Sequence, residues 1–185
     1  TSAPAVNPGQ TLEIPFTVTG SEGATLSLVP SVDNDEYVCA LGKVDYVNYQ
    51  GIIKLTAPEV ITEATEVKVS LTASDTHKRS LTKSVSVKVN ASEPLSISAL
   101  GEPASMAVKA GGSFTLSYKV LNLAPAKITG IPTVEVTSGW SAEATVDQDI
   151  IKVKYNAPAS IGQRINIKIS ATDDHGRKVE YSGTL

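Results

Sequence analysis

Two histidines are the residues of this sequence whose chemistry first suggests a site. His77 and His175 are the only histidines of the chain, and each lies close to an aspartate. Imidazole is a common metal ligand and general base, but Asp174-His175-Gly176 is also a favourable sequence for a tight turn. Zinc needs three or four ligands in one place, and each segment supplies one histidine. We therefore interpret both histidines as exposed turn residues.

Acidic clusters are the second group that could do chemistry, because carboxylate oxygens are ligands that calcium prefers. Neither Asp33–Glu36 nor Asp147–Asp149 has the glycine and terminal glutamate of an EF-hand loop. Calcium is thus a candidate cofactor against the alternative of solvated loops. At the second of the two repeated turns, Arg177 and Lys178 offer a further alternative, since they could neutralise the carboxylates. The candidate ligands are Asp33, Asp35, Asp173 and Asp174.

Aromatic side chains could form a binding surface. Tyr46 and Tyr49 lie in segment 44–51, which is predicted as a loop with no equivalent in the second half of the chain. They are the candidate residues for binding a glycan or a protein, against the alternative of ordinary packing. Trp140 shares its strand phase with Ala142 and is expected in a core.

The sequence does not favour catalysis. It has no glycine-rich phosphate loop, no Gly-x-Ser-x-Gly and no cysteine–histidine neighbourhood. Cys39 is the single cysteine, so no disulfide can form within the chain. It lies in the strand-like segment 37–41 and is interpreted as a buried structural thiol. We expect a protein that is not an enzyme and has no cofactor other than the possible calcium.

The segments that carry the two histidines are copies of one repeated sequence pattern. Segments 67–89 and 165–181 both alternate apolar and polar residues on either side of a short polar tip, which is typical of two antiparallel strands joined by a turn. The positions match one for one: Val67, Val69, Leu71, Ala73, Asp75, His77 and Arg79 fall on Ile165, Ile167, Ile169, Ala171, Asp173, His175 and Arg177.

The repeat divides the 185 residues into two domains, 1–92 and 93–185, joined at Asn90–Pro94. The second domain opens with a strand at Leu95–Leu100, whereas the first reaches its matching glycine turn at once. We therefore expect the first strand of domain 1 to lie upstream of Thr1. The net charge of −3 and the lack of a basic stripe disfavour a nucleic-acid partner. The sequence also has no apolar run of the about 20 residues that membrane insertion needs.

Short alternating strands with turn signals between them predict an all-β fold, namely two tandem immunoglobulin-like antiparallel β-sandwiches. In such a sandwich the turn between the last two strands lies at the same end as the N-terminus of the domain. The tip at Asp173–Gly176 is therefore expected near Glu93.

Several stretches of the second domain together resemble bacterial immunoglobulin-like modules. They are 111–120 (GGSFTLSYKV), 138–140 (SGW), 156–158 (NAP) and 167–177 (IKISATDDHGR). The resemblance implies an extracytoplasmic protein, secreted or anchored at the bacterial cell surface, for example as a lipoprotein. It further implies a spacer that presents other domains of the same polypeptide. The alternative is an adhesin-like module that binds a surface glycan or protein through segment 44–51.

Overall fold

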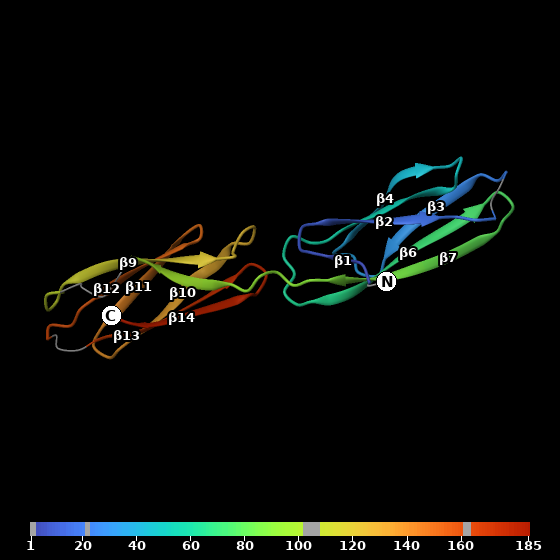
Figure 1. Ribbon diagram of the computed structural model, residues 1–185. Helices are drawn as coiled ribbons and strands as arrows, with labels where there is room; N and C mark the ends of the chain where they lie inside the picture. Colours follow the sequence, from blue (N-terminus) through green and yellow to red (C-terminus); the bar gives the residue numbers. More distant parts are fainter. Residues whose placement is uncertain (1–2, 21–22, 102–107, 161–163) are drawn as a thin grey trace. The chain divides into compact units, whose positions relative to one another are not determined.

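The computed structural model describes residues 3–20, 23–101, 108–160 and 164–185, and strands β1 to β14 are its regular elements. The chain divides into two compact units, Thr1–Ser92 and Glu93–Leu185, called unit 1 and unit 2 below. Within the described ranges the structure contains no helix, and so none that could cross a bilayer. The predicted all-β class is confirmed (Figure 1).

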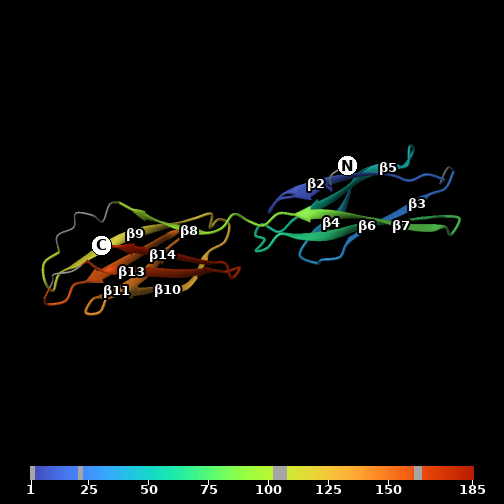
Figure 2. The same cartoon turned by 60° about the horizontal axis from the view of Figure 1, so that its bottom comes forward.

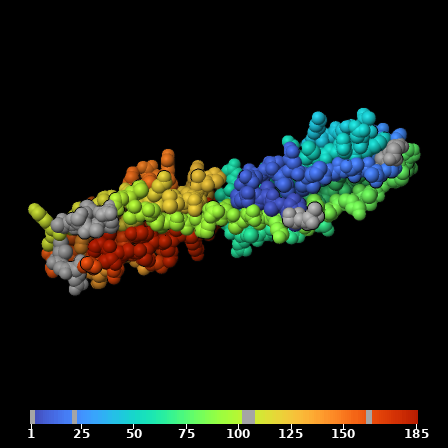
Figure 3. Space-filling view, viewed as in Figure 1, coloured from blue at the N-terminus to red at the C-terminus, as the bar shows by residue number. Residues whose placement is uncertain are grey.

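Unit 1 is a sandwich of two sheets, with strand orders β1-β7-β6-β3 and β2-β5-β4 (Figures 1 and 2). Its strands are β1 (Ala5–Val6), β2 (Thr11–Thr17), β3 (Leu26–Val32), β4 (Val38–Asp45), β5 (Gln50–Thr56), β6 (Thr65–Asp75) and β7 (Ser80–Val89). All neighbours in these sheets are antiparallel except β1 and β7, which run parallel. In the space-filling view of Figure 3, the blue N-terminal residues lie along the green surface of unit 1.

Unit 2 has the same plan, except that its first described strand pairs antiparallel with the next strand and not parallel with the last one. Its sheets have the orders β11-β12-β9-β8 and β10-β13-β14. The strands are β8 (Ser96–Leu100), β9 (Ser113–Leu121), β10 (Ile128–Val136), β11 (Ser141–Asp147), β12 (Ile150–Asn156), β13 (Asn166–Asp173) and β14 (Lys178–Thr184). In order along the chain these are strands A to G of an immunoglobulin constant-type sandwich, with A, B, E and D in one sheet and C, F and G in the other.

The duplicated hairpins keep one register, as the repeat predicts. Ala73 pairs with Leu81 in β6 and β7, and the matching Ala171 pairs with Val179 in β13 and β14. Strands β2 and β9 also match, because β2 pairs with β5 as β9 pairs with β12. A slip of one residue would turn every apolar side chain of a strand to solvent. The apolar alternation therefore fixes the register in both units.

Each sandwich buries the apolar side chains of alternating strand positions between its sheets. In unit 2, Ile151, Val153 and Tyr155 of β12 are fully buried, and the residues between them are exposed. In unit 1, Leu55 of β5 and Val69 of β6 are likewise buried in the core between the two sheets. Burial of one such side chain stabilises the fold by about 1.5–3 kcal/mol. Because Cys39 cannot form a disulfide within the chain, these cores and the sheet hydrogen bonds hold the units together.

Polar atoms inside the cores are paired. The hydroxyl groups of Tyr118 and Tyr155 lie 2.8 Å apart within unit 2. Among the described residues, no buried side-chain nitrogen or oxygen lacks a hydrogen-bond partner. Cys39 is only half-buried in β4, and burial raises the pKa of its thiol. Trp140 is also half-buried, and its ring meets Phe114 edge to face at 6.2 Å.

Candidate functional site

The first histidine lies in a turn that an aspartate organises. Asp75 Oδ1 accepts hydrogen bonds from the backbone amides of His77, at 2.9 Å, and Arg79, at 3.1 Å. Its Oδ2 accepts a further bond from Arg79 Nε at 2.7 Å. Although desolvation opposes the shift, these donors and the guanidinium lower the pKa of Asp75. The histidine contributes its backbone to this turn.

The second histidine lies in a copy of the same turn. Asp173 Oδ1 accepts from the amides of His175, at 3.0 Å, and Arg177, at 2.8 Å, and Oδ2 accepts from Arg177 Nε at 2.7 Å. The spacing Asp-x-His-x-Arg is therefore a turn-forming motif that both units use. The interpretation of the two histidines as turn residues agrees with this geometry.

In unit 2 the arginine of this motif also holds neighbouring segments. Arg177 Nη1 donates to the carbonyl of Glu93 at 3.3 Å, and Nη2 donates to the carbonyls of Asn122 and Leu123 at 3.4 and 3.3 Å. The hairpin tip is thereby bonded to the segment that leads into β8. The expected position of this tip near Glu93 is confirmed.

The structure brings together one group of metal-ligand type among the described residues, namely Asp173, Asp174 and His175. Both carboxylate oxygens of Asp173 already accept bonds within the turn. Asp174 Oδ1 accepts from Lys127 N at 3.0 Å and lies 2.9 Å from His175 Nδ1. The bond from Lys127 is the main cause of the lowered pKa of Asp174. Both carboxylates of this cluster already accept hydrogen bonds within the fold, and Arg177 supplies the positive charge beside Asp173.

The other acidic candidates lie in unit 1 and are not part of such a group within the described ranges. Asp33 Oδ1 accepts the backbone N–H of Lys68 at 2.8 Å, and Asp33 N donates to Lys68 O at 3.2 Å. This aspartate therefore ties the end of β3 to β6. Asp35 is exposed in the following turn.

Segment 44–51 differs from its prediction. It is a hairpin turn rather than a longer loop, since Val44 pairs with Gly51 and Asp45 with Gln50 across β4 and β5. Unit 2 has the equivalent turn between β11 and β12, so the expectation of no counterpart was wrong. The four turn residues 46–49 interrupt the strand alternation on either side, which concealed the hairpin.

The two tyrosines of this turn have different environments. Tyr49 Oη accepts a hydrogen bond from Gly23 N at 3.0 Å, and its backbone has a left-handed φ of 52°. Asp45 Oδ1 stabilises the turn through the amides of Val47 and Asn48. Tyr46 is 54% exposed and Val47 is 85% exposed. Tyr49 is thus part of the turn, whereas Tyr46 is the side chain that can meet a ligand.

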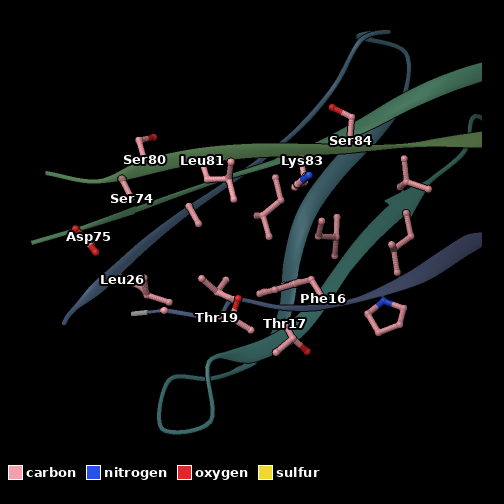
Figure 4. A pocket seen from close by; sticks show the side chains of 18 of the residues that line it. Phe16, Thr17, Thr19, Leu26, Ser74, Asp75, Ser80, Leu81, Lys83 and Ser84 are labelled. Carbon is pink, nitrogen blue, oxygen red and sulfur yellow. The ribbon is translucent and has the colours of Figure 1, made fainter. Parts of the chain in front are cut away.

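A groove in unit 1 is a further candidate site, formed by residues that are far apart in the sequence. It lies between the edges of the two sheets, where β2 and β7 face one another, and has a volume of about 460 Å³. Side chains from both sheets extend into it, as Phe16 and Leu81 do in Figure 4. Its apolar lining includes Ile14, Phe16, Leu26, Leu71, Leu81 and Val85. Asp75 and Arg79 of the turn motif lie at its border.

No protein-family model matches the chain, and no curated protein matches it. Solved structures that resemble it include the YadV chaperone, at 12% identity over 100% of this chain and 98% of that one, with a TM-score of 0.38. The I9-I11 tandem of titin matches at 12% identity over 100% of this chain and 64% of that one, with a TM-score of 0.39. The adhesin InvE of Yersinia pseudotuberculosis matches at 15% identity over 99% of this chain and 56% of that one, with a TM-score of 0.35.

These likenesses concern the fold alone. The strand order of unit 2 and the registers that unit 1 shares with it carry the assignment. The chain consists of two immunoglobulin-like β-sandwiches in succession.

Proposed function

We propose that this chain is a non-catalytic structural module of an extracytoplasmic protein, secreted or attached to a bacterial surface. Its two immunoglobulin-like domains serve as a spacer that carries other domains of the same polypeptide. The groups that could do chemistry support this role, because the candidate carboxylates Asp33 and Asp173 are each bonded to the backbone of a strand or turn.

The observation that carries the proposal is the parallel pairing of β1 with β7 in unit 1. Ala5 and Val6 lie opposite Lys88 and Val89. The amide of Lys88 donates to Pro4 O at 2.9 Å, and that of Asn90 donates to Val6 O at 3.1 Å.

Among the described residues of unit 1, these are the first and last strands. Tension along the polypeptide pulls them in opposite directions along their own axes, because they run parallel. Their hydrogen bonds are then loaded together, in shear, instead of opening one after another. The Asn90 Nδ2 to Asn7 Oδ1 bond at 2.7 Å continues the same connection. A domain with this arrangement resists extension, which a load-bearing spacer requires.

Single-molecule stretching of the whole chain tests the proposal. Unit 1 has Thr1–Ser92 as its bounds, and complete extension of such a unit releases about 300 Å of chain at 3.3–3.6 Å per residue. We expect a distinct force peak for unit 1 that falls sharply when residues 1–7 are deleted and partly in Val6→Ala. The peak of unit 2 in the same traces is the internal control. A unit 1 that extends at the same low force with and without β1 would contradict the load-bearing role.

The alternative function is adhesion through the turn between β4 and β5. The exposed Tyr46 and Val47 at its tip favour it. A screen of glycans and surface proteins with Tyr46→Ala tests it, because this side chain can be removed without disturbing the turn. Tyr49→Phe is the matched control, since it removes the hydroxyl that bonds Gly23. A specific ligand that is lost only in Tyr46→Ala supports adhesion, and a ligand bound equally by both variants contradicts it.

A further inference from the structure

Equivalent residues at the beginning of the last strand of each unit differ in the exposure of their side chains. Leu81 of β7 is 62% exposed, whereas its counterpart Val179 of β14 is 6% exposed. The side chain of Arg79 is 58% exposed, and that of Arg177 is 11% exposed. The sequence at these positions is similar, so something that covers unit 2 is missing from the described part of unit 1.

Strand β8 provides that cover in unit 2. It pairs antiparallel with β9 and also contacts β14, so it closes the gap between the two sheets. Tyr118 and Val120 of β9 lie opposite Ala99 and Ile97, and both are buried. Among the described residues of unit 1, β2 has a strand partner on one edge only.

The groove of unit 1 lies at this position. Phe16 and Val18, the counterparts of Tyr118 and Val120, are only partly buried there. Because Val18 N donates to Tyr49 O on the β5 side, the backbone groups of the adjoining Thr17 point to the opposite edge. The open edge of β2 thus presents a backbone donor and acceptor beside an apolar channel.

We propose that this groove binds one added β-strand, antiparallel to β2, which closes unit 1 as β8 closes unit 2. The occupant is an extended segment with alternating apolar side chains, joined to the N-terminal side of the unit. Its apolar residues fill the channel in the manner of Ile97 and Ala99. Its backbone pairs with Thr17, the counterpart of Lys119, which lies opposite Ser98.

The arginine of the turn motif completes the site. In unit 2, Arg177 donates to the carbonyl of Glu93, a residue of the segment that leads into β8. Arg79 keeps the same bond to its aspartate, while its guanidinium borders the open groove. It is placed to donate to a carbonyl at the beginning of the added strand.

A strand joined to unit 1 fits the groove better than a second copy of the chain does. Pro15 lies on the open edge of β2 at the position of Ser117, and it has no N–H for a ladder. Proline on an edge strand limits sheet-to-sheet association between molecules. In unit 2 the equivalent Ser117 lies opposite Leu100, the last residue of β8. Pro15 would therefore deprive an added strand of only its last backbone hydrogen bond to β2.

The direct test joins residues 94–102 to the N-terminus, ahead of Thr1. This prefix keeps the spacing that unit 2 has between β8 and β9, because Gly9 and Gly111 are equivalent turn residues. We expect the melting temperature of unit 1 to rise by about 5 °C or more and that of unit 2 to stay unchanged. The same prefix with Ile97→Asp is the matched control and should give no rise. Equal melting temperatures with and without the active prefix would overturn the proposal.

Binding in trans tests the groove separately. The probe is a labelled peptide of residues 93–101, titrated into the whole chain and followed by fluorescence anisotropy. Thr17→Pro should weaken binding at least tenfold, because it removes a donor on the open edge, and its far-UV circular dichroism should match that of the wild type. Saturable binding that Thr17→Pro leaves unchanged would place the peptide elsewhere and overturn the site. Dimerisation of the chain that excludes the peptide would show that a second copy is the occupant, which also overturns it.

Discussion

Arg177 and Asp173 form an ion pair that the fold of unit 2 encloses, with Arg177 Nε 2.7 Å from Asp173 Oδ2. The carboxylate side chain is 0% exposed and the guanidinium side chain is 11% exposed. The equivalent pair in unit 1 shares its bonds, but the side chain of Arg79 is 58% exposed. One motif therefore has two environments within the same chain.

This difference predicts unequal effects of removing the two arginines. Arg177→Ala leaves a buried carboxylate without its partner and should lower the free energy of unfolding of unit 2 by about 3 kcal/mol or more. Arg79→Ala should have a smaller effect on unit 1. The Asp75 side chain is 4% exposed, but the side chain of Arg79 is 58% exposed, so water can take the place of the guanidinium. Urea unfolding measures the first through the fluorescence of Trp140, the single tryptophan, which lies in unit 2. Equal losses for the two variants would contradict the role of burial.

The tyrosine pair in the core of unit 2 predicts non-additive mutations. Tyr118→Phe leaves the hydroxyl of Tyr155 buried without its 2.8 Å partner, which should cost about 1–3 kcal/mol. Tyr155→Phe should cost a similar amount for the same reason. The double variant removes both polar groups and should be less destabilised than the sum of the two single variants. Urea unfolding of all four proteins gives the coupling energy, and simple additivity would argue against the bond.

The same pair predicts sensitivity to alkali. Burial, followed by the hydrogen bond with Tyr155, raises the pKa of Tyr118, and burial raises that of Tyr155. The folded state therefore holds these protons more tightly than the unfolded chain, whose tyrosines ionise near pH 10. The free energy of unfolding is fully present below that pH and should fall as the pH rises above it. The Tyr118→Phe, Tyr155→Phe double variant should lose much of this slope in unfolding experiments between pH 8 and 12.

Calcium is expected to have little effect on this protein. Asp173 is already saturated by Arg177 and two amides, so binding calcium would first require breaking that turn. Calorimetric titration of the wild type should therefore give no heat of specific binding. Asp174→Asn, which alters the more exposed carboxylate of the cluster, is the control. A saturable heat that disappears in Asp174→Asn would establish a cation site there.

Much of the fold could be predicted because it depends on local patterns. Alternation with a period of two marks a half-buried strand, and the same alternation at 67–89 and 165–181 identified both final hairpins. The Asp-x-His-x-Arg motif could be placed in their turns for the same reason. In segment 44–51 the pattern was too short, since four turn residues interrupt two strands that carry few apolar side chains there.

The candidate site depended on contacts that no local pattern records. Leu81 and Val179 look alike in sequence, and only the strand laid across Val179 makes it buried while Leu81 remains exposed. Likewise, Asp173 resembles a calcium ligand until the fold brings Arg177 and two amides onto its oxygens. Strand identity and register follow from residues close in the chain. Exposure, pairing of charges and the open edge of β2 follow from which distant segments come together, and that is decided when the two sheets pack.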